Sequence, residues 1–300
     1  MCQERNETGQ GFVMCQDEKD SERMKVLRRI RLLEQEGRFD VDAEDDPPTI
    51  PLMPDQIDYL RTKFISRLKR KAAYMVAGLF VNSLIRKKKL IIKQVIGMEN
   101  LNCVKSGAII TCNHFHPYDC LMVEHLFQNS EQMGKKQLFK VIREGNYTNF
   151  PGFYGVLFRN CNTLPLSRMK ETMYQFLKAV DTILTRGDFI LVYPEQSMWW
   201  NYRKPKPLKN GAFKFAVRNH VPVIPFFITM EDGDKMGADG FPVQEYTIFI
   251  KEPIYPQTEG AIREQAQAMK EENAHVWKQV YEDFYGSPLV YSVPQERTRL

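Results

Sequence analysis

The sequence lacks the composition of several large protein classes. Its 300 residues include only six cysteines, 17 glycines and 17 prolines, which excludes a disulfide-stapled scaffold and a collagen-like repeat. A charged fraction of 26% beside 43% hydrophobic residues excludes disorder throughout the chain. The length fits one large α/β domain or two smaller ones, with ample chain to bury a core.

Motifs that carry nucleophilic, nucleotide and zinc chemistry are also missing. No G-x-S-x-G sequence supplies the nucleophile of a serine hydrolase, and no Walker-type or G-x-G-x-x-G loop favours nucleotide binding. The cysteines form no C-x-x-C pair and no Cys/His zinc spacing, so we expect reduced thiols that mostly pack. No nucleic-acid-binding module accompanies the basic residues, so we predict no nucleic-acid partner.

Long apolar runs are absent as well. The first residues, 1–7, contain no apolar stretch of the kind that a secretory signal needs, which with the reduced cysteines predicts a cytoplasmic protein. The apolar run Ala72–Ile85 is 14 residues long and is interrupted by Asn82 and Ser83. It is short for a membrane-spanning helix, which needs ~20 mostly apolar residues.

Acidic residues are missing from one long segment. Residues 61–93 hold 11 basic residues and no acidic one, whereas residues 1–46 hold eight basic and 13 acidic residues. Such a basic block typically meets an anionic partner, and an apolar run between basic flanks has the profile of an interfacial helix. We therefore expect peripheral attachment to an anionic surface, the inner face of the cell membrane. A core helix of the same domain fits the pattern equally well.

Changes in composition divide the chain into three segments. Residues 1–46 are expected to form a polar acidic tail, loosely ordered except for one helix over Met24–Glu36. Residues 47–95 are expected to form a basic amphipathic helical segment that faces the membrane. Residues 96–300 alternate short apolar runs with amphipathic stretches, which predicts an α/β domain with a central, mostly parallel sheet flanked by helices. The expected strands are 108–112, 189–193, 223–229 and 246–251, and the expected helices are 117–127, 170–185, 211–219 and 261–285.

Polar residues follow two of these strands at the point where each strand ends. His114 and Asp119 come after strand 108–112, and Glu195 comes after strand 189–193. Because sites in open α/β sheets lie outside the carboxyl ends of the strands, we expect these three side chains to share a pocket. A histidine held by an aspartate is a general base with a fixed tautomer.

Other interpretations of this cluster stay open. His116 lies three residues before Asp119 and competes with His114 for the carboxylate, or simply caps the helix that Pro117 begins. The two histidines and Asp119 are also potential metal ligands. No further His or Cys lies nearby in the sequence, so we rank the general base above a metal site and predict no metal.

Four blocks along the chain resemble, in order, those of the glycerolipid acyltransferases, the family of 1-acylglycerol-3-phosphate O-acyltransferase. The blocks are Asn113-His114-(x4)-Asp119, Gly155–Arg159 with Leu164–Arg168, Tyr193–Ser197, and Lys209–Lys214 with Val221–Pro225. Their occurrence in the family's order over residues 96–255 is far more specific than any one block.

The resemblance implies transfer of a fatty acyl group from an acyl-CoA or acyl-carrier-protein (acyl-ACP) thioester to the hydroxyl of a lysophosphatidic-acid-like acceptor. The donor is a co-substrate, and neither a cofactor nor a metal is implied. By the same resemblance, His114 removes the hydroxyl proton and Asp119 orients its imidazole. The substrate-binding residues that it implies are Asn113, Arg159, Arg168, Glu195, Ser197, Lys209 and Pro225.

The third block departs from the family's pattern. Gln196, Ser197 and Met198 stand where the family commonly has Gly, Thr and Arg, so an arginine expected at the acceptor phosphate is absent. Candidate replacements for its charge are Arg203, Lys204, Lys206 and Lys209. The neighbouring pair Trp199-Trp200 suits contact with a lipid interface, although buried tryptophans are commoner. Two alternatives follow: an acyltransferase with an amino-lipid or other acceptor, and a catalytically degenerate lipid-binding homologue.

Overall fold

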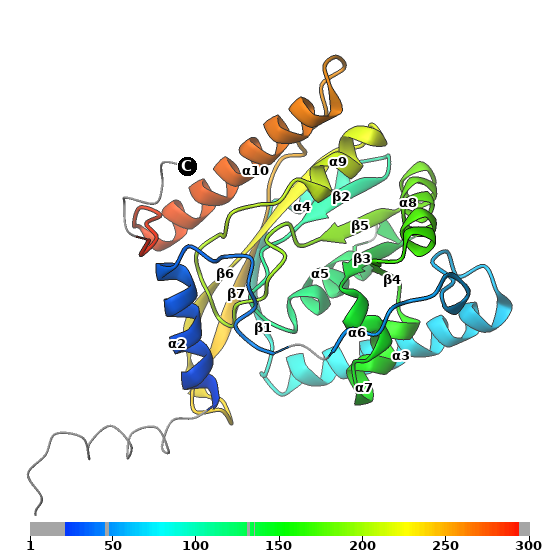
Figure 1. The fold of residues 1–300 in the computed structure, drawn as a ribbon. Helices are drawn as coiled ribbons and strands as arrows, with labels where there is room; N and C mark the ends of the chain where they lie inside the picture. The colour runs from blue at the N-terminus through cyan, green and yellow to red at the C-terminus, as the bar shows by residue number, and fades with distance from the viewer. Residues whose placement is uncertain (1–21, 46–47, 131–132, 135, 294–300) are drawn as a thin grey trace, which may run out of the picture.

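Figure 1 shows the computed structural model of the chain, which describes residues 22–45, 48–130, 133–134 and 136–293. Its centre is a seven-stranded sheet in the order β1-β7-β6-β2-β5-β3-β4. Neighbouring strands run parallel except β6 and β7, which are antiparallel. The strands are Ile91–Ile96 (β1), Ala108–Thr111 (β2), Leu138–Ile142 (β3), Thr163–Pro165 (β4), Phe189–Val192 (β5), Val223–Met236 (β6) and Pro242–Ile250 (β7).

Helices connect these strands and pack on both faces of the sheet (Figure 1). They are Glu22–Gln35 (α2), the 3-10 turn Pro54–Gln56 (η1), Phe64–Arg86 (α3), Met98–Asn102 (α4), Asp119–Gln128 (α5), Glu144–Thr148 (α6), Gly152–Asn160 (α7), Lys170–Thr185 (α8), Gly211–Arg218 (α9) and Ile262–Tyr285 (α10). Phe176, Phe213 and Trp277 of α8, α9 and α10 pack on one face with Ile109. Ile110 joins the core formed with α3, α4 and α5 on the other face, so β2 is buried on both sides.

The expected α/β architecture is confirmed, with all four expected strands and all four expected helices of the body present. Three strands were not expected, namely β1, β3 and β4. Strand β1 begins inside residues 47–95, the segment that we expected to be helical. It pairs with β7 along one edge of the sheet, where its Ile and Val residues favour extended backbone.

Residues 22–45 pack against the body of the protein. Ile30 and Leu33 of α2 are buried in a small core with Ala43 and Trp199. The expected helix is present. The expectation of a loosely ordered tail is wrong for residues 22–45, because they pack against the Trp199 indole and form hydrogen bonds with the body of the protein. Residues 1–21, which include Cys2 and Cys15, lie outside the described residues.

Helix α3 has two apolar faces. Ala73, Ala77, Val81 and Leu84 are buried, mainly against α5 and α7, so one face of α3 belongs to the core. The opposite face exposes large apolar side chains to solvent: Phe64, Ile65, Leu68, Met75, Val76 and Leu79. In the part of the chain that the structure describes, no helix combines the length and hydropathy needed to cross a bilayer.

Candidate active site

The loop between β2 and α5 brings His114 and Asp119 together. Asp119 is the first residue of α5, and its Oδ2 lies 2.7 Å from Nδ1 of His114. The carboxylate is buried, whereas the imidazole keeps 25% of its side chain exposed. Because a carboxylate only accepts hydrogen bonds, Nδ1 of His114 carries the proton and Nε2 is left as the basic nitrogen.

Three further donors fix the Asp119 carboxylate. The backbone N–H groups of Phe115 and His116 donate to Oδ2, at 3.2 and 3.3 Å, and the Tyr193 hydroxyl donates to Oδ1 at 2.7 Å. The Tyr193 ring also stacks on the His114 ring, with 4.1 Å between centroids. Burial, followed by the Asp119 charge, raises the pKa of Tyr193 well above its usual value, so its hydroxyl keeps the proton that it donates.

His116 does not compete for this carboxylate through its ring. Its Nδ1 accepts a hydrogen bond of 3.1 Å from the backbone N–H of Tyr118, and burial lowers its pKa to about 4. The part of the chain with described positions contains no group of three or more His, Cys, Asp or Glu residues arranged to hold a metal ion.

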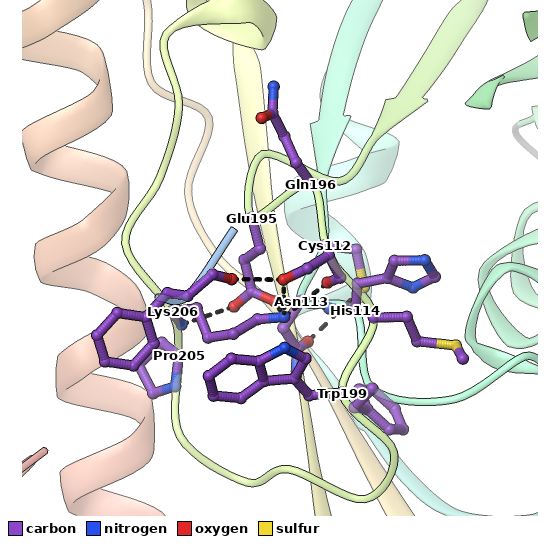
Figure 2. A network of polar contacts seen from close by, with 12 residues as sticks. Cys112, Asn113, His114, Glu195, Gln196, Trp199, Pro205 and Lys206 are labelled. Atoms are coloured by element: carbon purple, nitrogen blue, oxygen red, sulfur yellow. Dashed lines mark hydrogen bonds and ion pairs between the residues drawn. The ribbon is translucent and has the colours of Figure 1, made fainter. Parts of the chain in front are cut away.

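Glu195 joins the loops that follow β2 and β5 (Figure 2). Its Oε2 accepts the backbone N–H of His114 at 3.0 Å, and its Oε1 accepts the backbone N–H of Lys206 at 2.8 Å. The Lys206 ammonium lies 3.6 Å from Oε2, and both side chains are fully buried. Burial raises the pKa of Glu195 and lowers that of Lys206, and each charge opposes the shift of the other.

Lys206 also forms hydrogen bonds with the third block. Its ammonium donates to the backbone oxygen and the hydroxyl of Ser197, at 2.6 and 2.9 Å. The Ser197 hydroxyl in turn donates to the backbone oxygen of Phe39 at 2.5 Å. The third block is therefore tied to residues 39–45, which we call the acidic segment because it contains Asp40, Asp42, Glu44 and Asp45.

The acidic segment covers the third block and is bonded to it repeatedly. The Trp199 indole N–H donates to the backbone oxygen of Val41 at 2.7 Å, and the Met198 N–H donates to Asp42 Oδ1 at 3.0 Å. Asp42 also forms an ion pair with Arg143. Trp199 and Trp200 are both buried, so the structure does not place either ring at a lipid interface.

A cavity of about 1400 Å³ borders the His114 imidazole and Asp119. That volume exceeds the usual range for sites of drug-sized ligands, roughly 300–1,000 Å³. One part of its lining is largely apolar and comes from α3, α5 and α7, through Ala77, Leu121, Tyr154, Leu157 and Phe158. The acidic segment and the end of the β6–β7 hairpin line other parts of the same cavity.

The remaining residues expected to bind substrate are dispersed. Lys209 lines the cavity and pairs with Asp40 at 3.2 Å. Asn113, Glu195 and Ser197 do not line it, and their side chains bond the protein's own backbone. Arg159, Arg168 and Pro225 do not line it either: Arg159 donates to the backbone oxygens of Tyr147 and Phe150, Arg168 is exposed, and Pro225 is buried in β6.

Each cation proposed as a replacement for the missing arginine is already paired with a carboxylate. Arg203 binds Asp232, Lys204 binds Glu34, Lys206 binds Glu195 and Lys209 binds Asp40. Gln196 lies in the left-handed region, with φ of 68°, where glycine is the residue with no steric cost. Its side chain points away from the Glu195 cluster and lines the cavity (Figure 2).

Sequence reasoning missed two features of the site, namely the role of Tyr193 and the role of the acidic segment. Tyr193 lies in the third block. Its position at the end of a buried strand was the available signal, because the hydroxyl of a buried tyrosine usually needs a hydrogen-bond partner. The contact of the acidic segment with the third block had no local signal, because the bonded residues of the third block and Trp199 lie more than 150 positions away in the chain.

Comparison with known proteins identifies a matching family model and several similar solved structures. Residues 93–229 match the family model described as Acyltransferase, in agreement with the four blocks. No curated protein matches the chain significantly. Among solved structures, the 1-acyl-sn-glycerophosphate (LPA) acyltransferase PlsC from Thermotoga maritima aligns at 17% identity with a TM-score of 0.48, covering 75% of this chain and 82% of that one.

Proposed function

We propose that this chain, whose residues 93–229 match the acyltransferase family, moves a fatty acyl group from an acyl-CoA or acyl-ACP thioester to the hydroxyl of a lysophosphatidic-acid-like acceptor. The observation that carries the proposal is the contact of 2.7 Å between His114 Nδ1 and Asp119 Oδ2 at the wall of a large, partly apolar cavity. A base on such a wall suits an acceptor hydroxyl attached to a long acyl chain.

The reaction follows from the proton positions. With Nδ1 bonded to Asp119, Nε2 of His114 takes the proton of the acceptor hydroxyl as its oxygen attacks the thioester carbonyl carbon. The C–O bond forms, the C–S bond breaks, and the imidazolium returns the proton to the leaving thiolate. No acyl-enzyme is needed, because the acceptor itself is the nucleophile.

Asp119 and Tyr193 act through His114. The four hydrogen bonds to Asp119 hold the carboxylate in one orientation, and this fixes the imidazole tautomer. Stacking on Tyr193 fixes the plane of the ring. Glu195 holds the backbone on which His114 stands, through the His114 N–H.

The test is a thiol-release assay in which purified protein receives acyl-CoA or acyl-ACP with and without a panel of lysophospholipid acceptors. We expect release that depends on the acceptor, with lysophosphatidic acid among the substrates. His114→Ala and Asp119→Asn should each lower kcat by about 10²–10⁴-fold, the usual contribution of a positioned base. Full activity in His114→Ala would refute the mechanism.

The third block favours a second candidate, transfer to an acceptor with a different headgroup. No arginine stands at position 198, and both Arg143 and Lys209 are paired with acidic-segment carboxylates. In the acceptor panel, an amino-lipid or unphosphorylated acceptor used in preference to lysophosphatidic acid would select this candidate. Vesicle binding without turnover on any acceptor would instead indicate a degenerate lipid-binding homologue.

We also propose that α3 attaches the protein to the cytoplasmic face of an anionic membrane. Within residues 47–95 the exposed side of this helix would face the membrane, whereas β1 belongs with residues 96–300 to the sheet of the catalytic domain. Support comes from the exposed apolar face of α3, where Phe64, Leu68 and Leu79 are 72%, 60% and 67% exposed. Exposed basic residues, among them Lys63 and Arg67, lie beside that face. Apolar insertion together with attraction to anionic lipid headgroups is the usual pairing for such helices.

A further inference from the structure

Half of the cations that line the cavity are already neutralised. Eight basic residues line it. Four of them pair with carboxylates: Arg23 with Glu44, Lys140 with Glu124, Arg143 with Asp42, and Lys209 with Asp40. Three of these four carboxylates belong to the acidic segment, so a substrate phosphate near the third block would meet paired cations and neighbouring negative charges.

The other four cations form a second group. Lys87, Lys88, Lys89 and Lys235 are exposed and line the same cavity, and within the described ranges their ammonium groups have no carboxylate or hydrogen-bond partner. The three consecutive lysines follow the last residue of α3, and Lys235 lies near the end of β6. Figure 1 shows that end of α3 and the tip of the β6–β7 hairpin at the same end of the molecule.

We propose that Lys87, Lys88, Lys89 and Lys235 form the phosphate-binding site of this cavity, away from the third block. The inference rests on the proposed acyl transfer and assigns the anionic part of a substrate to these lysines. Two substrates carry phosphate: coenzyme A, the donor carrier, and a lysophosphatidic-acid-like acceptor. Both present phosphate oxygens, which accept hydrogen bonds from ammonium groups.

The backbone at Lys88 supports a role for its side chain. Lys88 lies in the left-handed region with φ of 53°, directly after the helix. The N–H of Lys88 donates to Ile85 O at 2.9 Å, and that of Lys89 donates to Leu84 O at 2.9 Å. Glycine is the residue usually found at this helix-ending position, because it adopts the left-handed region at no steric cost. A lysine here is therefore better explained by what its side chain binds than by the turn.

This backbone supplies a variant that separates folding from charge. Lys88→Gly removes one ammonium group and relieves the left-handed strain, so we expect a melting temperature equal to or above that of the native protein. The triple variant Lys87→Gln/Lys88→Gly/Lys89→Gln removes three charges on the same backbone. Arg86→Gln is the matched control, because Arg86 is exposed and adjacent but does not line the cavity.

Binding is measured by calorimetry with coenzyme A and, separately, with a short-chain lysophosphatidic acid below its critical micelle concentration. For at least one of these probes we expect the triple variant to raise Kd about tenfold, and Lys88→Gly to raise it by a smaller factor. Arg86→Gln should leave both Kd values unchanged. Unchanged Kd values for both probes in the triple variant would overturn the proposal.

Turnover then identifies which phosphate is bound. If the lysines hold the donor, the triple variant raises KM for acyl-CoA but not for an acyl-N-acetylcysteamine thioester, which has no phosphate. If they hold the acceptor, KM rises for lysophosphatidic acid but not for monoacylglycerol. Weaker vesicle binding with unchanged Kd and KM would assign the lysines to the membrane and refute the site. Tight, lysine-dependent binding without any turnover would leave the site standing and refute the proposed function.

Discussion

Substitution of His116 should remove a measurable part of the protein's sensitivity to acid. The His116 ring packs between Tyr118 and Tyr246, with ring centroids at 4.8 and 6.5 Å, and its Nδ1 accepts the Tyr118 N–H. Protonation of Nδ1 breaks that hydrogen bond and places a positive charge in a half-buried position at the cavity wall. Burial accordingly lowers the pKa of His116 from 6.5 to about 4 in the folded state.

The sign and size of the effect follow from linkage. Between pH 6.5 and 4 the folded state binds fewer protons at His116 than the unfolded chain does. The unfolding free energy is therefore unaffected by His116 well above pH 6.5 and decreases as the pH falls through this range. The loss amounts to about 2 kcal/mol at pH 5 and about 3 kcal/mol below pH 4. Either value is a large fraction of a typical unfolding free energy of roughly 5–15 kcal/mol.

His116→Asn is the matched variant. The amide oxygen that it introduces can accept the N–H two residues ahead, as the imidazole does, but the amide does not titrate. Urea unfolding of both proteins from pH 4.5 to 7 gives the two stability curves. We expect the native protein to lose about 2 kcal/mol more than the variant between pH 7 and 5. Parallel curves would refute the assignment, whatever the constant offset from lost ring packing.

Two further predictions concern packing and membrane attachment. Lys206→Met leaves the Glu195 carboxylate buried without its cation and should lower the unfolding free energy by about 3–5 kcal/mol. The double variant with Glu195→Gln should recover part of that loss, and an equal loss in urea unfolding would contradict the ion-pair explanation. Leu68→Ser/Leu79→Ser should weaken binding to anionic vesicles at least tenfold (on the order of 1 kcal/mol or more) in a sedimentation assay. Leu32→Ser, on the exposed side of α2, is its control, and an equal loss there would argue against attachment through α3.

The parts of the fold that the sequence predicted are those with a local signal. Strands β2 and β5 are continuous apolar runs, because each is buried on both faces, and α8 and α10 are long amphipathic helices. Strand β4 has only three residues, the apolar run of β3 is interrupted by Lys140, and β1 and β4 lie at the two edges of the sheet. Their pairing depends on backbone partners elsewhere in the chain, which no local periodicity reveals.

The candidate site divides in the same way. His114 and Asp119 were predicted to meet because they lie only five positions apart on one strand-to-helix turn. The side chains expected to bind substrate were assigned from matched blocks, and blocks do not tell a side chain that faces a cavity from one that holds the backbone. Glu195 is the example: it is buried between two backbone N–H groups and an ammonium group.

Long-range packing also decides which charges a substrate can use. The net charge of +5 and the basic run identify where cations are frequent, but Lys204 and Lys209 pair with carboxylates 170 and 169 residues away. Asp42 takes both the Arg143 guanidinium and the Met198 N–H, so an anionic headgroup bound there would have to displace the acidic segment or accept its repulsion. The absent arginine at position 198 and the acidic segment therefore belong to one arrangement. Among the described residues, the cations that line the cavity beside the third block are paired, and this is why we place the proposed phosphate site at the lysines after α3.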